Sequence, residues 1–212
     1  MAELRNSLIY WGRSMEKYFM LMLVIPLATA VGMSVMSGEV DFEYILFYVP
    51  LIFSISILAI AFQNITAALS NIIALGATRK EGFLGMQISF HLLVLQEMII
   101  NAVILWLLPD VFAVDKITIG TFIAALFILA CAFGNVINVV VMRSGMNKAK
   151  IVYIAELLVI AMIDIFVLQI CEYIAIPFLG TISFITFVFG IALDVIATGM
   201  CNKAVKEYEV CV

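Results

Sequence analysis

The sequence predicts an all-α polytopic membrane protein with six transmembrane helices, an interfacial amphipathic helix before the first, and both termini in the cytoplasm. Hydrophobic residues make up 66% of the 212 residues and charged residues 12%, and the mean hydropathy is +1.21. A soluble domain of this size does not have such a composition. The apolar runs are also continuous over about 20 residues, the length that a helix needs to cross the hydrocarbon core. Continuous runs argue against a membrane barrel, whose strands alternate apolar and polar residues.

The first predicted element is an amphipathic helix at residues 4–17. Leu8 and Trp11 lie on its apolar face, whereas Arg13 and Lys17 lie on the opposite face. A helix of this kind lies in the membrane interface, with Trp11 at headgroup depth and the cations in water. It either anchors and orients the first span or, in addition, contacts a cytoplasmic partner.

Six membrane spans follow, and they account for nearly all of the remaining chain. The loops between them are short, so the sequence predicts one transmembrane domain over residues 1–212 with no second domain. The spans are predicted at 18–37, 44–62, 82–108, 118–142, 152–176 and 178–201.

The charge distribution orients these spans. Cytoplasmic loops of membrane proteins carry an excess of Lys and Arg. All but one of the eleven Lys and Arg residues here fall before span 1, between spans 2 and 3, between spans 4 and 5, or after span 6, and Lys116 is the exception. The other connections are acidic, so both termini are predicted inside. The ten cytoplasmic cations are Arg5, Arg13, Lys17, Arg79, Lys80, Arg143, Lys148, Lys150, Lys203 and Lys206.

The segment between spans 2 and 3, residues 63–81, is the most informative of the connections. It stays compatible with a helix but becomes more polar, and it ends in a basic turn. Gly76 is placed to end one helix, and Thr78 is placed to cap the next one together with Glu81, three residues later. The result is an exposed, rigid, basic turn. On physical grounds alone a plain cytoplasmic turn explains it.

A resemblance adds a function to this turn. Ala68-Leu69-Ser70 and then Gly76-Ala77-Thr78-Arg79-Lys80-Glu81-Gly82-Phe83-Leu84-Gly85 resemble the Gly-x-Thr-Arg-Lys turn in membrane subunits of type-2 ATP-binding-cassette (ABC) permeases. Those subunits also have six spans, an amphipathic helix before the first, and both ends inside. In that family the segment between spans 2 and 3 docks into a separate ATPase. The resemblance implies that this ATPase contact is made by Asn64, Ala68, Ser70, Asn71, Gly76, Thr78, Arg79, Lys80 and Glu81.

The resemblance also implies the partners and the location. The chain has no Gly-x-x-x-x-Gly-Lys-[Ser/Thr] sequence to hold ATP phosphates, so ATP and Mg²⁺ are expected on a separate ABC ATPase subunit and no cofactor in this chain. A second copy of the chain, or a related permease chain, is expected to complete the path in a bacterial-type cytoplasmic membrane. The substrate class implied is an amphipathic or hydrophobic peptide or drug-like molecule, similar to that of small peptide exporters such as the phenol-soluble modulin exporter. No basic stripe exists for nucleic acid.

Several ionisable residues fall inside the predicted spans, where a charge costs about 2.5–3.5 kcal/mol on insertion scales. Asp164 lies at the middle of span 5 and Glu97 in the outer part of span 3, whereas Asp194 lies nearer the cytoplasmic side. They line a path for a cationic or amphipathic substrate, or they hold the bundle together by interhelical hydrogen bonds; for Asp194 the second interpretation is favoured. The path candidates are Asp164, Glu97, His91, Asn101, Asn135 and Asn138.

The sequence indicates neither a catalytic group nor a metal site. His91 has no second His nearby and the four cysteines match no common zinc spacing, so His91 is interpreted as a packing or hydrogen-bonding residue. No Ser/His/Asp or Cys/His grouping shares one membrane face. Two other functions stay open: a proton-coupled secondary transporter that uses the intramembrane carboxylates, and a non-transporting scaffold or immunity protein.

Overall fold

The computed structural model describes residues 6, 8–13, 16–17, 20, 24–25, 28–29, 31–32, 36, 42–65, 69–74, 78–107, 113–173 and 178–207. Of these residues 96% are helical and none lies in a strand. The fold is therefore all-α over the described part of the chain. Its helices are α2 (Phe42–Gln63), α3 (Leu69–Ala74), α4 (Arg79–Leu107), α5 (Lys116–Ser144), α6 (Met146–Tyr173) and α7 (Leu179–Glu207).

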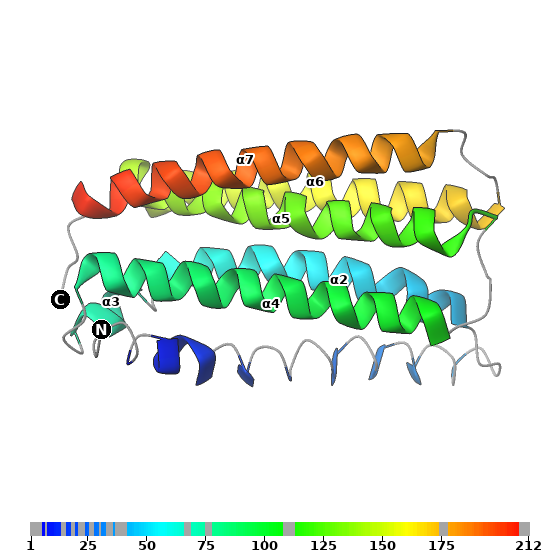
Figure 1. The fold of residues 1–212 in the computed structure, drawn as a ribbon, viewed down its shortest axis with the longest axis horizontal. Coiled ribbons are helices and arrows are strands. Elements are labelled where there is room, and N and C mark those ends of the chain that lie inside the picture. The colour runs from blue at the N-terminus through cyan, green and yellow to red at the C-terminus, as the bar shows by residue number, and fades with distance from the viewer. Residues whose placement is uncertain are drawn as a thin grey trace.

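The long helices lie side by side, and each runs antiparallel to the next along the chain (Figure 1). Three of them, α4, α5 and α7, are long and apolar enough to cross a membrane, and α2 adds a shorter apolar stretch at Tyr48–Gln63. These properties fit a membrane protein. The five segments predicted as spans from residue 44 onward overlap the helices α2, α4, α5, α6 and α7. The predicted first span, 18–37, lies mostly outside the described residues.

Helix α5 is the centre of the bundle. In its most apolar stretch 72% of the residues are buried, against 39% for α4 and 17% for α7. A central helix touches neighbours on all sides, so it needs small residues where those neighbours come closest. Gly134 provides one such position, because a Cβ added there would lie 2.5 Å from the Cβ of Ala61 on α2.

Gly190 on α7 allows a second close approach. A Cβ added to Gly190 would lie 2.9 Å from Cγ2 of Ile128 and 3.4 Å from the backbone nitrogen of Leu129, both on α5. Atoms this close would have to move apart. The two glycines therefore set the spacing of α2 and of α7 against α5.

The ends of α5 follow from local chemistry. Asp115 caps its start by accepting hydrogen bonds from the backbone N–H and the hydroxyl of Thr118, at 2.9 and 2.7 Å. At the other end Gly145 has φ of 82°, a conformation that favours glycine, and its N–H donates to the carbonyl of Val141. Helix α6 begins at the next residue, Met146. A single residue thus reverses the chain between α5 and α6.

Candidate functional site

A cluster of polar side chains joins three helices inside the bundle. Each helix supplies two residues spaced by four, which places both on one helix face. The pairs are Gln87 and His91 on α4, Cys131 and Asn135 on α5, and Asp194 and Thr198 on α7. We refer to these six residues as the polar cluster.

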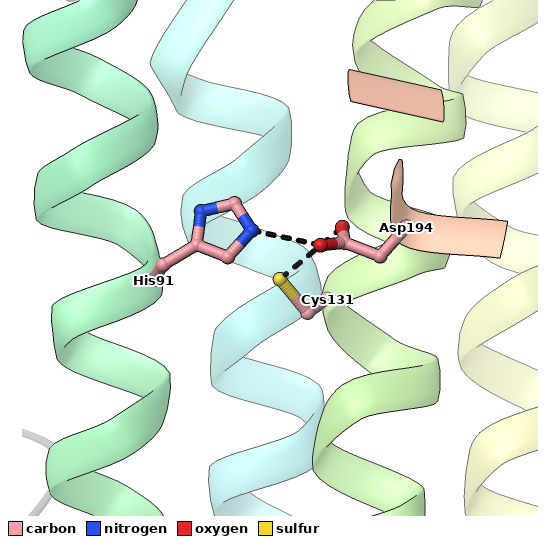
Figure 2. A group of neighbouring side chains, drawn as sticks. All are labelled: His91, Cys131 and Asp194. Atoms are coloured by element: carbon pink, nitrogen blue, oxygen red, sulfur yellow. Dashed lines mark hydrogen bonds and ion pairs between the residues drawn. The ribbon is translucent and has the colours of Figure 1, made fainter. Parts of the chain in front are cut away.

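Asp194 is the centre of the polar cluster. Its Oδ2 lies 2.8 Å from Nε2 of His91, and its Oδ1 accepts a hydrogen bond of 2.8 Å from the Asn135 amide. The Cys131 thiol donates to the same Oδ1 at 3.6 Å. Figure 2 shows the side chains of His91, Cys131 and Asp194 converging from their three helices.

Asn135 connects Asp194 to the rest of the cluster. The side-chain oxygen of Asn135 accepts a hydrogen bond of 2.8 Å from the Gln87 side-chain amide. The side-chain nitrogen of Asn135 also lies 3.3 Å from the Thr198 hydroxyl. The backbone carbonyl of Asn135 accepts from the thiol of Cys201 at 3.2 Å. Asn135 is thus bound to both flanking helices and is itself fully buried.

The tautomer of His91 follows from its neighbours. Nδ1 lies 2.7 Å from the backbone carbonyl of Gln87, and because a carbonyl only accepts, Nδ1 carries a proton. Nε2 faces the Asp194 carboxylate, so one further proton lies between them. The pair is either imidazolium with carboxylate or neutral imidazole with carboxylic acid.

The charge on Asp194 has few possible counterions. The sequence has no Lys or Arg at positions 82–115, 117–142 or 151–202. The Asp194 side chain is 15% exposed and that of His91 is 41% exposed. A charge inside a low-dielectric bundle is costly without a partner. The negative charge of Asp194 is therefore stabilised by His91 and by the hydrogen bonds of the polar cluster.

The structure brings together two of the predicted path residues. His91 and Asn135 both bind Asp194. The hydrogen bonds at Asp194 agree with the interhelical role favoured for it from the sequence.

The other path candidates are buried and, in the described part of the chain, form no hydrogen bond to Asp194. Glu97 and Asp164 are fully buried, and in the described part of the chain their carboxylate oxygens have no hydrogen-bond partner. Asn101 donates to the backbone carbonyl of Glu97 at 3.2 Å. Asn138 is buried, and neither polar atom of its side chain finds a partner among the described residues.

The described residues of the predicted coupling segment lie at one end of the bundle (Figure 1). The hydroxyl of Thr78 accepts a hydrogen bond of 3.2 Å from the backbone N–H of Glu81 and donates to the Glu81 carboxylate at 2.7 Å, so the predicted cap on α4 is confirmed. Arg79 and Lys80 are exposed. The Arg79 guanidinium donates a long bond of 3.5 Å to the backbone carbonyl of Lys206, near the end of α7.

The remaining predicted coupling residues differ in how exposed they are. Asn64 is buried at the end of α2, whereas Asn71 in α3 is exposed and Ser70 lies in the same short helix. Ala68 and Gly76 lie outside the described residues. The structure thus places an exposed basic start of α4 close to α3 and to the end of α7 (Figure 1).

The predicted interfacial helix is tied to this same end. The described positions of 4–17 are helical. Trp11 is fully buried and donates its indole N–H to the backbone carbonyl of Gly82, 3.2 Å away, while Arg13 and Lys17 are exposed. The sequence predicts Trp11 at the depth of the lipid headgroups. The structure instead buries its side chain against the start of α4.

Sequence reasoning missed Cys131, Gln87 and Thr198 as members of a site. Its expectation that no Cys/His grouping exists is wrong, because the Cys131 thiol and the His91 imidazole both contact the Asp194 carboxylate. A signal was available, because each of the three helices carries two polar residues four apart inside an apolar run. In a membrane bundle such a pair marks a face that has to meet polar partners. Comparison with protein-family models, with curated proteins and with solved structures found no match for this chain.

Proposed function

We propose that this chain is the membrane-spanning subunit of an ABC exporter, with six spans, both termini in the cytoplasm and a separate ATPase. The observation that carries the proposal is the exposed basic start of α4. Arg79 and Lys80 are presented to solvent by a helix whose first turn Thr78 caps. A docking element has to be exposed, and the cap at Thr78 supports the helical conformation of the turn that carries these two cations.

The contacts of this end support a coupling role. Arg79 contacts the end of α7, and Trp11 binds the carbonyl of Gly82, one turn into α4. A force applied by a partner at this turn therefore reaches α4, α7 and the interfacial helix together. The substrate path lies between such helices in a pair of subunits, formed by two copies of this chain or by this chain and a related permease.

The test is purification of the chain from its host membrane, followed by identification and ATPase assay of whatever co-purifies. The variant Arg79→Glu/Lys80→Glu reverses both exposed cations. The matched control is Lys148→Glu/Lys150→Glu, which reverses two exposed cations at the start of α6. We expect a stoichiometric P-loop ATPase with the unmodified chain and with the control, and its loss with the Arg79/Lys80 variant. A chain that purifies without an ATPase, or a variant that keeps it, refutes the proposal.

A second candidate function, a proton-coupled transporter, rests on the burial of Glu97 and Asp164. Neither carboxyl group has a hydrogen-bond partner among the described residues, and buried carboxyl groups inside membrane spans take part in proton relays. This function predicts that the chain purifies alone. It also predicts that a candidate amphipathic substrate triggers proton movement in proteoliposomes, and that Glu97→Gln abolishes the movement.

A further inference from the structure

We propose that His91, Cys131 and Asp194 form a binding site for one zinc ion inside the bundle. Each residue offers one ligand atom, and these atoms all lie within 4.8 Å of one another. In a tetrahedral zinc site with bonds of about 2.0–2.3 Å, ligand atoms lie about 3.6 Å apart. Small side-chain rotations therefore bring the three ligand atoms around one ion (Figure 2).

The ligand set is suited to zinc. Imidazole nitrogen, thiolate sulfur and carboxylate oxygen are the three donor types that Zn²⁺ takes from proteins. A site made only of oxygen ligands would favour Mg²⁺ or Ca²⁺. The Cys131 thiolate is a soft ligand, so it favours zinc over these two ions. Three protein ligands leave a fourth position for water or for a further ligand.

The surrounding hydrogen bonds have the form found around metal ligands. A histidine ligand usually donates its other ring N–H to a carbonyl or carboxylate, which fixes its tautomer and orientation. Here Nδ1 of His91 donates to the Gln87 carbonyl, and this leaves Nε2 facing Asp194. The Asn135 amide holds Oδ1 of Asp194 in the same way, so both ligands are oriented before an ion enters.

The charge balance favours an ion at this place. Zinc carries two positive charges, and the thiolate and the carboxylate carry one negative charge each, so the complex with neutral imidazole has no net charge. A neutral complex is the least costly form in an apolar interior. On binding, Cys131 releases its thiol proton and the His91–Asp194 pair releases the proton between them, both to water.

The three ligand residues differ in exposure. Cys131 is buried, but the side chain of His91 is 41% exposed and that of Asp194 is 15% exposed. The other described thiol, Cys201, is also buried but bonds to the backbone carbonyl of Asn135 instead, which makes it a matched control.

The experiment is a Co²⁺ titration of the detergent-solubilised full chain, because a thiolate bound to cobalt gives a charge-transfer absorption that nitrogen and oxygen ligands do not. We expect one Co²⁺ per chain with this absorption, and its displacement by Zn²⁺. The Cys201→Ser variant should keep the absorption and Cys131→Ser should lose it. His91→Gln and Asp194→Asn should each weaken Zn²⁺ binding by more than about 100-fold, because changes to residues that only orient ligands already cost about 10–100-fold.

A chain in which Cys131 is the sole cysteine keeps the test decisive if Cys131→Ser fails to fold. That chain carries Cys171→Ser, Cys201→Ser and Cys211→Ser, and it should retain the cobalt–thiolate absorption. Absence of the absorption from the unmodified chain or from the sole-cysteine chain overturns the proposal. So does equal absorption in a folded Cys131→Ser variant, because another thiol would then hold the metal.

Discussion

The indole N–H of Trp11 donates a hydrogen bond to the backbone carbonyl of Gly82, across 71 positions of sequence. Gly82 lies in the first turn of α4, next to the exposed cations of the proposed coupling turn. The helical segment at residues 8–13 and the start of α4 are therefore joined by a direct contact.

Trp11→Phe should weaken the contact between the helical segment at residues 8–13 and α4. The carbonyl of Gly82 loses the indole N–H donor, at a cost of about 0.5–1.5 kcal/mol, and the smaller ring also leaves a cavity at this buried position. We expect a lower Tm in detergent. Trp106→Phe is the control, because Trp106 is 79% exposed and its replacement should leave the Tm unchanged. An equal Tm for the two variants would show that the Trp11 contact contributes nothing.

Asn135→Leu should destabilise the bundle far more than Asn138→Leu. Both residues lie on α5 and are fully buried. Asn135 bonds to Gln87 and Asp194, so its loss leaves buried polar groups unpaired, at about 1–3 kcal/mol each. Asn138 has no hydrogen-bond partner among the described residues, so leucine there is expected to be neutral or stabilising. Thermal unfolding of both variants in the same detergent measures the difference.

Gly134→Ala should push α2 away from α5. The new Cβ would lie 2.5 Å from the Cβ of Ala61, and overpacking of this kind costs about 1–3 kcal/mol. Moving the methyl group by the double change Ala61→Gly/Gly134→Ala should recover much of the lost stability. Gly199→Ala on α7 is the control, because a Cβ there meets nothing within 4 Å. Failure of the double variant to recover stability would locate the strain elsewhere.

Asp115 should give the start of α5 a stability that depends on pH. The hydroxyl of Thr118, followed by its backbone N–H, lowers the pKa of Asp115 below its ordinary value. A group whose folded pKa is lowered stabilises the fold above its unfolded pKa of about 4, and this contribution is lost as pH falls through the folded pKa. Asp115→Asn keeps a capping side chain but cannot ionise. The difference in Tm between the two chains should therefore vanish at low pH, and a constant difference would contradict the assignment.

The sequence predicted the helices well because each depends on a local property. Continuous apolar runs give α4, α5 and α7, and the Thr78–Glu81 spacing gives the cap of α4. These signals lie within a few residues of one another, so no knowledge of the packing is needed to detect them.

The polar cluster could not be predicted in the same way. His91 and Asp194 are 103 positions apart, and Cys131 and Asp194 are 63 apart. Their contact depends on the rotation of three helices about their axes, which is set by packing at positions such as Gly190 on α7. Zinc motifs based on short spacings therefore missed a group of ligands that the fold assembles from three helices.

The position of Asp194 on α7 also affects membrane insertion of the chain. For a chain that enters a bilayer one helix at a time, a carboxylate on the last helix arrives when His91 and Asn135 are already in place. Its hydrogen-bond partners are already in the bilayer when Asp194 arrives, so the carboxylate can bind them at once and is not exposed to lipid. A chain that lacks α7 instead leaves the side chains of His91 and Asn135 without the carboxylate that they bind in this structure.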